Sequence, residues 1–141
     1  MRPEVVEKLV AAIERRDADA LADVFADDAV LHHPLARESI EGKGAIVASE
    51  QALFDAFSEI EVEVVRVIGK ANEVAIEVVV CATNTGALDV GGEEALPATG
   101  RRIELPSVWL LRLDSDGKIA EERDYLDTAS LFRQLGLAGD S

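Results

Sequence analysis

The sequence predicts an α+β fold in which helices pack on one face of a curved antiparallel sheet. Apolar residues recur at helical spacing in the first 57 residues, whereas segments rich in Val and Ile dominate residues 60–126. A short helical pattern follows the last of these segments. Helices that precede a run of long strands are typical of α+β proteins, and no linker composition interrupts the chain. We therefore expect one domain over residues 1–141.

The helices are predicted from apolar spacing and capping residues. Val5, Leu9 and Ile13 indicate a first helix over about residues 3–15. Asp17 or Asp19 can cap a second, short helix, whose apolar residues are Leu21, Val24 and Phe25. A third helix is expected over about residues 44–57, burying Ile46, Leu53 and Phe57.

The strands are predicted from β-branched residues and turn signals. We expect a brief strand at 29–33, stopped by Pro34, and long strands at 60–68, 74–83, 103–113 and 118–126. Residues 84–100 hold four of the ten glycines and are typical of a long hairpin connection. Asp127 can cap a terminal helix that Gly136 ends.

Composition excludes several classes of partner. The net charge of −14 repels phosphate backbones and anionic lipid, so neither nucleic acid nor a membrane is an expected partner. No apolar run approaches the roughly 20 residues that span a bilayer. The first residues lead directly into an amphipathic pattern, so we expect no signal peptide. The single cysteine, Cys81, cannot form an internal disulfide, which favours the cytoplasm.

Known metal and cofactor motifs are missing from the sequence. The two histidines are adjacent, so on a strand they point to opposite faces, and no CxxC or HxxxH pattern occurs. The glycine-rich stretches do not form GxGxxG or a phosphate loop, and no GxSxG motif is present. We predict no metal and no cofactor.

The last strand carries the residues of greatest chemical interest. Alternation places Glu122, Asp124 and Leu126 on one face. Asp127 already supplies the helix cap, so Asp124 has no such local role. It is either a solvated or salt-bridged acid near a sheet end, or a general acid/base whose pKa is raised by burial and by Glu122.

Three other residues each admit two interpretations. One of His32 and His33 faces the interior, either as a hydrogen-bonded core histidine or as a proton relay or substrate contact. Trp109 is either a core aromatic or the wall of a pocket. Cys81 lies on a Val-rich strand and is expected to be a buried, inert thiol.

Several segments together resemble one known family. The stretch PATGRRIELPSVWLLRLDSDGKIAEERDYLDTASLFRQLGL, with the earlier DADALADVFADDAVLHHP and EGKGAI, resembles the SnoaL-like polyketide cyclases of the NTF2-like superfamily. The resemblance covers nearly the whole chain. It implies a cone-shaped α+β barrel with a short C-terminal helix, a hydrophobic pocket, no cofactor and a homodimer.

The resemblance also implies roles for individual residues. In the cyclases an Asp on the last strand is the general acid/base of an intramolecular aldol closure, and Asp124 matches it. The related limonene epoxide hydrolases share an RDYxD segment, whose first Asp also matches Asp124. His33 matches a pocket position of those hydrolases, which makes His33 the inward histidine and His32 the outward one.

At some positions this chain differs from the residues that the related enzymes need, which argues against some of their functions. The hydrolases need an Arg and a second Asp where this chain has Val79 and Cys81, which argues against epoxide hydrolysis. The cyclases often carry His or Gln where Ser107 and Trp109 stand. These substitutions leave the usual cyclase substrates in question.

We therefore expect an acid/base enzyme that acts on an apolar carbonyl compound, polycyclic compounds included, with Asp124 and His33 as catalytic residues. The substrate-binding residues would be Leu31, Val79, Cys81, Leu105, Ser107, Trp109, Glu122 and Leu126. The alternatives are a non-catalytic binding or dimerisation module on the same scaffold, and hydration like that of an epoxide hydrolase. A sheet face bearing Val78 and Val80 would be the dimer interface.

Overall fold

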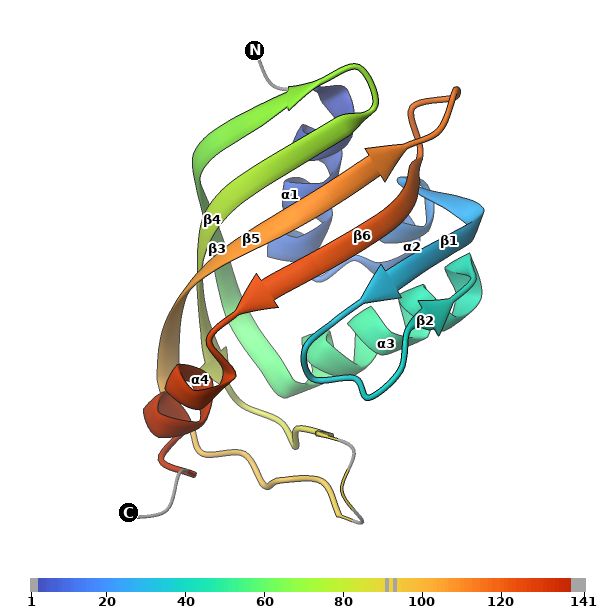
Figure 1. Cartoon of the computed structure of the whole chain (residues 1–141). Coiled ribbons are helices and arrows are strands. Elements are labelled where there is room, and N and C mark those ends of the chain that lie inside the picture. The colour runs from blue at the N-terminus through green and yellow to red at the C-terminus, as the bar shows by residue number, and fades with distance from the viewer. Residues whose placement is uncertain (1–2, 91, 93, 138–141) are drawn as a thin grey trace.

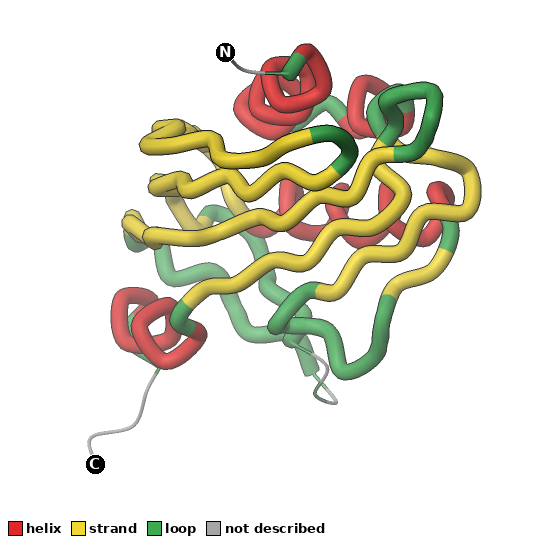
Figure 2. The backbone as a smooth tube through the Cα atoms, turned by 45° about the horizontal axis from the view of Figure 1, so that its top comes forward, coloured by secondary structure: helices red, strands yellow, loops and turns green. Residues whose placement is uncertain are grey.

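The computed structural model describes residues 3–90, 92 and 94–137, and it confirms the α+β fold. Six strands form one curved, open sheet in the order β2-β1-β6-β5-β4-β3 (Figure 1). Helices α1, α2 and α3 cover one face of this sheet, here called the inner face, and α4 lies at one end of it (Figure 2). Residues 91 and 93 of the predicted 84–100 connection lie outside the described residues.

The helices follow the predicted capping pattern closely. Helix α1 is Glu4–Arg15, α2 is Ala18–Ala22, α3 is Lys43–Ala56 and α4 is Thr128–Leu135. Asp17 caps α2 by accepting from the Ala20 amide, and Asp127 caps α4 by accepting from the Ser130 amide. Gly136 ends α4 in the left-handed conformation, at φ 76°.

Four of the five predicted strands are longer than the sequence predicts, the last one is shorter by one residue, and β2 was not predicted. They are β1 Phe25–His32, β2 Ile40–Glu41, β3 Phe57–Lys70, β4 Glu73–Asn84, β5 Arg102–Leu113 and β6 Ile119–Leu126. The prediction that Phe25 belongs to the second helix is wrong, because α2 ends at Ala22 and Phe25 begins β1. Strand β3 likewise starts directly after α3, so Phe57 is a strand residue.

The pairing of β1 with β6 brings distant parts of the chain together. These strands run parallel, with His32 opposite Arg123, whereas the other pairs in the sheet are antiparallel. The next residues along each strand, His33 and Asp124, therefore lie side by side and point to the inner face. The parallel pair thus places the predicted inward histidine beside the predicted acid.

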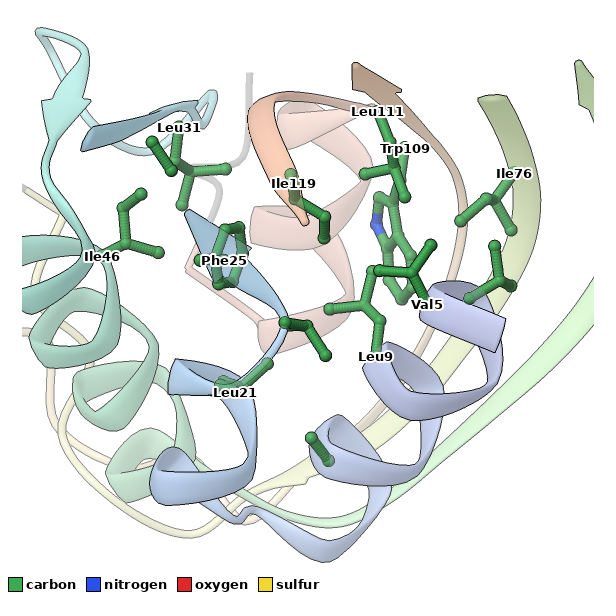
Figure 3. Close-up of a cluster of buried hydrophobic side chains, with 14 of the residues drawn as sticks. Val5, Leu9, Leu21, Phe25, Leu31, Ile46, Ile76, Trp109, Leu111 and Ile119 are labelled. Carbon is green, nitrogen blue, oxygen red and sulfur yellow. The ribbon is translucent and has the colours of Figure 1, made fainter. Parts of the chain in front are cut away.

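Two apolar clusters fill the space between the sheet and the helices. Figure 3 shows the larger one, in which side chains of α1, α2 and α3 face those of the strands; it includes Val5, Leu9, Leu21, Phe25, Leu31, Ile46, Ile76, Trp109, Leu111 and Ile119. The second cluster joins α4 to the ends of β4 and β5 and includes Ile103, Leu105, Leu131 and Leu135. Burial of these side chains, at about 25 cal/mol per Å² of apolar surface, holds the helices against the sheet.

The predicted dimer interface is wrong, because its residues lie on the covered inner face of the sheet. Val78 is fully buried in the larger cluster, and Val80 packs against that cluster from the same face. Neither side chain is available to a second subunit. The exposed apolar side chains of the opposite, outer face include Leu110 and Tyr125, and the homodimer itself stays a prediction.

In the described part of the chain, no helix is both long and apolar enough to cross a membrane.

Candidate active site

A cavity of about 130 Å³ lies between the two apolar clusters, on the inner face of the sheet. Its apolar walls come from the four helices, from β1, β3, β4, β5 and β6, and from the segment after β1. They comprise Leu9, Ile13, Leu21, Phe25, Leu35, Leu53, Phe54, Phe57, Ile60, Val80, Ala82, Ile103, Leu105, Trp109, Leu126 and Leu131. Four titratable side chains also line it: His33, Glu50, Glu122 and Asp124. A mostly apolar cavity with a few convergent polar groups is the usual form of a small-molecule site.

The cavity opens toward larger grooves near the segment that follows β1. A groove of about 380 Å³ shares His33, Leu35 and Leu53 with it. Another of about 310 Å³ shares His33 and Asp124. The buried cavity has room for about one small ring, since an apolar cavity of roughly 150 Å³ accommodates benzene. A larger molecule would therefore extend past His33 into these grooves.

A wider groove of about 590 Å³ lies elsewhere, on the outer side of the strands near Leu110. Its lining includes Arg112, Arg123 and Glu121, whose charges already pair with one another. The buried acids and His33 do not line it. The smaller inner cavity is therefore the better candidate for chemistry.

Strand β6 delivers two carboxyl groups to the cavity. Glu122 is opposite Leu111 and Asp124 is opposite Trp109 on the neighbouring β5, so both point inward with those core residues. Glu122 is only 4% exposed. Neither Glu122 Oε1 nor Asp124 Oδ1 has a hydrogen-bond partner among the described residues, although both atoms are buried. Such atoms are costly to bury, by about 1–3 kcal/mol each, and they commonly mark functional sites.

The pKa values of these two acids are both raised. Burial is the largest cause for Asp124, followed by the charge of Glu122, a hydrogen bond with Glu122 and the charge of Glu50. Burial also raises the pKa of Glu122, while the hydrogen bond with Asp124 acts in the opposite direction. In this hydrogen bond Asp124 is the donor and Glu122 the acceptor, because the bond raises the pKa of Asp124 and acts to lower that of Glu122.

Glu50 is a third acid, and it comes from α3 rather than from the sheet. Burial, and then the charge of Glu122, raise the pKa of Glu50 from 4.5 to about 8. The sequence prediction missed this residue. A signal was present, because Glu50 lies four residues after Ile46 and four before Phe54, which places it on the buried side of α3.

His33 is neutral in the cavity. Burial lowers its pKa from 6.5 to about 4. Its Nδ1 atom accepts a hydrogen bond from the Leu35 amide at 3.1 Å, so the proton of the neutral ring is on Nε2. Nε2–H can then donate a hydrogen bond inside the cavity. A hydrogen-bond donor fits this state of the ring better than a proton relay does.

His32 lies outside the cavity. Its Nε2 atom is 2.9 Å from Glu121 Oε2 on the outer side of β6. This contact, more than the charges of Arg123 and Arg112, lowers the pKa of Glu121. The two histidines therefore have separate surroundings, with His33 inward and His32 outward.

The structure brings most of the predicted site residues together. Besides Asp124 and His33, the cavity is lined by Leu105, Ser107, Trp109, Glu122 and Leu126. Trp109 belongs to the core cluster and to the cavity wall at once, so both of its interpretations hold. The Ser107 hydroxyl is buried and donates to the Leu105 carbonyl at 3.3 Å.

Three predicted substrate-binding residues lie outside the cavity. Val79 and Cys81 point to the outer face, because Val79 is paired with Pro106 and Cys81 with Glu104, while Val80 and Ala82 take the inner positions. Cys81 is also only half-buried, not buried as expected. Leu31 is on the inner face but is packed in the larger core cluster, away from the cavity.

The inner positions of β4 cannot supply the charged groups of an epoxide hydrolase. Val80 and Ala82 are apolar, and the cavity lining contains neither Arg nor Lys among the described residues. Over the same residues, no group of three or more His, Cys, Asp or Glu side chains has the geometry of a metal site. The lining instead offers acids, a neutral imidazole and apolar surface.

Comparison with known proteins identifies relatives of this chain. The model of the SnoaL-like domain family matches residues 6–122, a range that includes His33, Glu50 and Glu122 and ends just before Asp124. Over 47 residues the chain is 45% identical to aklanonic acid methyl ester cyclase DnrD of Streptomyces peucetius; this stretch is 33% of the chain and 32% of the relative. The chain thus matches only about a third of that enzyme's length.

Solved structures agree at the level of the fold. TsrD from Streptomyces laurentii superimposes with a TM-score of 0.80 at 18% identity, over 96% of this chain and 94% of TsrD. An epoxide hydrolase of M. tuberculosis, described as LEH-like, superimposes with a TM-score of 0.70 at 20% identity, over 93% and 86% of the two chains. The family model covers most of the chain, and these structures share its curved sheet and helices; the chain belongs to the SnoaL-like domain family.

Proposed function

We propose that this protein is a cofactor-independent, cyclase-type enzyme that closes a ring within an apolar carbonyl compound, with Asp124 as general acid/base. The observation that carries the proposal is the Glu122–Asp124 pair, two carboxyl groups that line one apolar cavity and whose pKa values are both raised, chiefly by burial. Such a pair offers a base and an acid at the same time, as an aldol reaction requires. The name of the relative DnrD, aklanonic acid methyl ester cyclase, supports the same class of reaction.

The proposed reaction needs no external reagent. The carboxylate of the pair removes a proton from the carbon next to one carbonyl, and this carbon attacks a second carbonyl of the same molecule. The carboxylic acid of the pair protonates the oxygen of that second carbonyl. One C–H bond and one C=O π bond are replaced by a C–C bond and an O–H bond, and the proton returns across the pair.

His33 and the cavity walls would assist this step. The Nε2–H of His33 would donate to the oxygen on which negative charge develops, which favours the transition state in a site without bulk water. The reacting ring would occupy the cavity of about 130 Å³, while the rest of a polycyclic substrate would extend into the grooves beside His33.

The test is turnover of a cyclase substrate by wild type and Asp124→Asn. Aklanonic acid methyl ester is the first substrate to try, with chromatographic detection of ring-closed product. A positioned acid/base contributes about 10²–10⁴-fold, so the variant should lose at least 100-fold in kcat. Glu121→Gln, one strand position from Glu122 but on the outer side, is the matched control and should retain turnover.

Two results would contradict the proposal. If Asp124→Asn keeps its turnover, Asp124 is not the acid/base. If wild type binds this ester and related carbonyl compounds without converting them, the protein is a binding module on the same scaffold. Solvent labelled with ¹⁸O separates a third possibility, because hydration would place the label in the product and ring closure would not.

A further inference from the structure

The cavity presents hydrogen-bond acceptors that the protein does not satisfy. Glu122 Oε1 and Asp124 Oδ1 are buried and have no partner among the described residues. Glu122 is more than nine-tenths buried, and its carboxyl group points into the cavity. A buried carboxylate without a donor is strongly disfavoured, so a ligand that supplies donors at these two oxygens would gain affinity.

The state of the pair shows what kind of ligand could do so. With Asp124 donating to Glu122, the buried, unpartnered oxygens Glu122 Oε1 and Asp124 Oδ1 both remain as acceptors. A ligand carbonyl is itself an acceptor and cannot satisfy them. An alcohol brings one donor, whereas a protonated primary amine brings three donors and a positive charge.

The charges that line the cavity also favour a protonated amine as the ligand. Glu50 from α3 adds a third acid to the cavity, and His33 is neutral. The lining has no Arg or Lys in the described part of the chain, so an anionic ligand would meet no positive charge of a basic side chain there. Trp109, opposite Asp124 on β5, provides an aromatic wall that can attract a cation within about 6 Å of its ring.

We propose that this cavity binds a small apolar molecule, or the apolar part of a larger one, through a protonated primary amine placed at Glu122 and Asp124. The walls would hold a body of about one ring, as the cavity volume of about 130 Å³ requires. This inference does not depend on the proposed ring closure, since it concerns binding and requires no turnover.

The test compares cyclohexylamine with cyclohexanol, which have the same ring and differ in the polar group. Trp109 is the only tryptophan of the chain and lines the cavity, so its fluorescence reports binding. At pH 8 and 150 mM salt, we expect the Kd of the amine to be at least tenfold lower than that of the alcohol. Cyclohexanecarboxylate should bind more weakly than either.

Variants connect this preference to the cavity. Glu122→Gln, nearly the same size, should reduce the preference for the amine to threefold or less. Asp124→Asn should have the same effect, and it serves as the test if Glu122→Gln does not fold. Glu121→Gln is the control for the general attraction of a −14 protein for cations, and it should retain the tenfold preference. Folding of each variant is checked by circular dichroism.

The pH dependence gives an independent readout. Glu50 on α3 ionises at a pKa of about 8, and Glu122 and Asp124 on β6 also have raised pKa values, while His33 stays neutral above pH 6. Affinity for cyclohexylamine should therefore rise from pH 6 to pH 8, and affinity for cyclohexanol should not. The proposal is overturned if the alcohol binds as tightly as the amine, if neither binds, or if Glu122→Gln keeps the preference.

Discussion

At the scale of single residues, the chemistry of this protein depends on how Glu122 changes Asp124. The two carboxyls are two residues apart on β6 and face the same way. In water each of these acids would have a pKa near 4. Burial raises both pKa values, the charge of Glu122 raises that of Asp124 further, and both proposals use this buried pair.

Glu122→Gln should lower the pKa of Asp124. The substitution removes two of the causes that raise this pKa, the charge of Glu122 and the hydrogen bond to its carboxylate, and it leaves burial in place. The pKa of Asp124 should fall but stay above 3.8. Carboxyl-carbon NMR titration measures it, with Asp124→Asn to assign the resonance.

The control for this titration is Glu121→Gln. Glu121 belongs to the ion pairs with His32 and Arg123 on the outer side and is not among the causes of the Asp124 shift. An unchanged pKa of Asp124 in this variant is expected. An Asp124 pKa at or below 3.8 in wild type would contradict the buried pair itself.

Alternation along β6 was enough to predict that Glu122 and Asp124 share a face, because side chains on a strand repeat every two residues. The inward position of His33 came from the family resemblance instead. Val79 and Cys81 were assigned to the wrong face because they were matched to positions of the hydrolases. Alternation with Glu73 and Glu77 of the same strand would have placed them on the outer face. Glu50 was missed because an acid on a helix is ordinarily a solvated residue.

At the scale of secondary-structure elements, Asn84 fixes the connection between β4 and β5 to the end of α3. Asn84 is 1% exposed. Its Nδ2 atom donates to the carbonyls of Ala56 at 3.0 Å and Gly86 at 2.9 Å, and its Oδ1 atom accepts from the amide and hydroxyl of Thr99 at 2.8 and 3.0 Å. One side chain thus joins three segments.

Asn84→Ala should destabilise the protein by about 2–4 kcal/mol, because several buried partners lose their hydrogen bonds together. Urea unfolding measures this change. Asn84→Asp keeps the acceptor for the Thr99 amide but loses both donors, so hydrogen exchange at this amide should increase mainly in Asn84→Ala. Exchange should increase in both variants at the Gly86 amide, which donates to the same Ala56 carbonyl that Asn84 binds. Equal protection at Thr99 in the two variants would contradict this account.

The ends of the elements were harder to predict than their types. Phe25 continues the apolar spacing of α2, so the sequence extends the helix through it. In the structure its backbone pairs with Ile119 of β6, a contact that lies far away in the sequence. Caps are local, and the predicted roles of Asp17, Asp127 and Gly136 are therefore all confirmed.

At the scale of the whole molecule, the buried acids make stability depend on pH. The pKa of Glu50 is raised from 4.5 to about 8, so the folded state holds its proton more tightly than the unfolded state does. The stability that this provides is complete below pH 4.5 and is lost as pH rises through 8. Each pH unit in this interval costs at most about 1.4 kcal/mol.

Glu50→Gln should therefore flatten the fall in stability between pH 6.5 and pH 8. His33, with a pKa lowered to about 4, affects stability between pH 4 and 6.5 and in the opposite direction, so the higher interval isolates the acids. Urea midpoints at the two pH values give the difference. An equally steep fall in Glu50→Gln would show that Glu50 is ionised in the folded protein at pH 6.5.

The parallel pairing of β1 with β6 also has a consequence for how the protein folds. His32 and Glu121 are in contact although they are 89 residues apart in the chain. Hairpins β3–β4 and β4–β5 join neighbouring parts of the chain, whereas the β1–β6 pairing that places His33 near Asp124 joins distant parts of it. The candidate active site is accordingly expected to form late in folding, after the sheet that supports it, and a chain still leaving the ribosome would have no cavity until β6 is free to join β1.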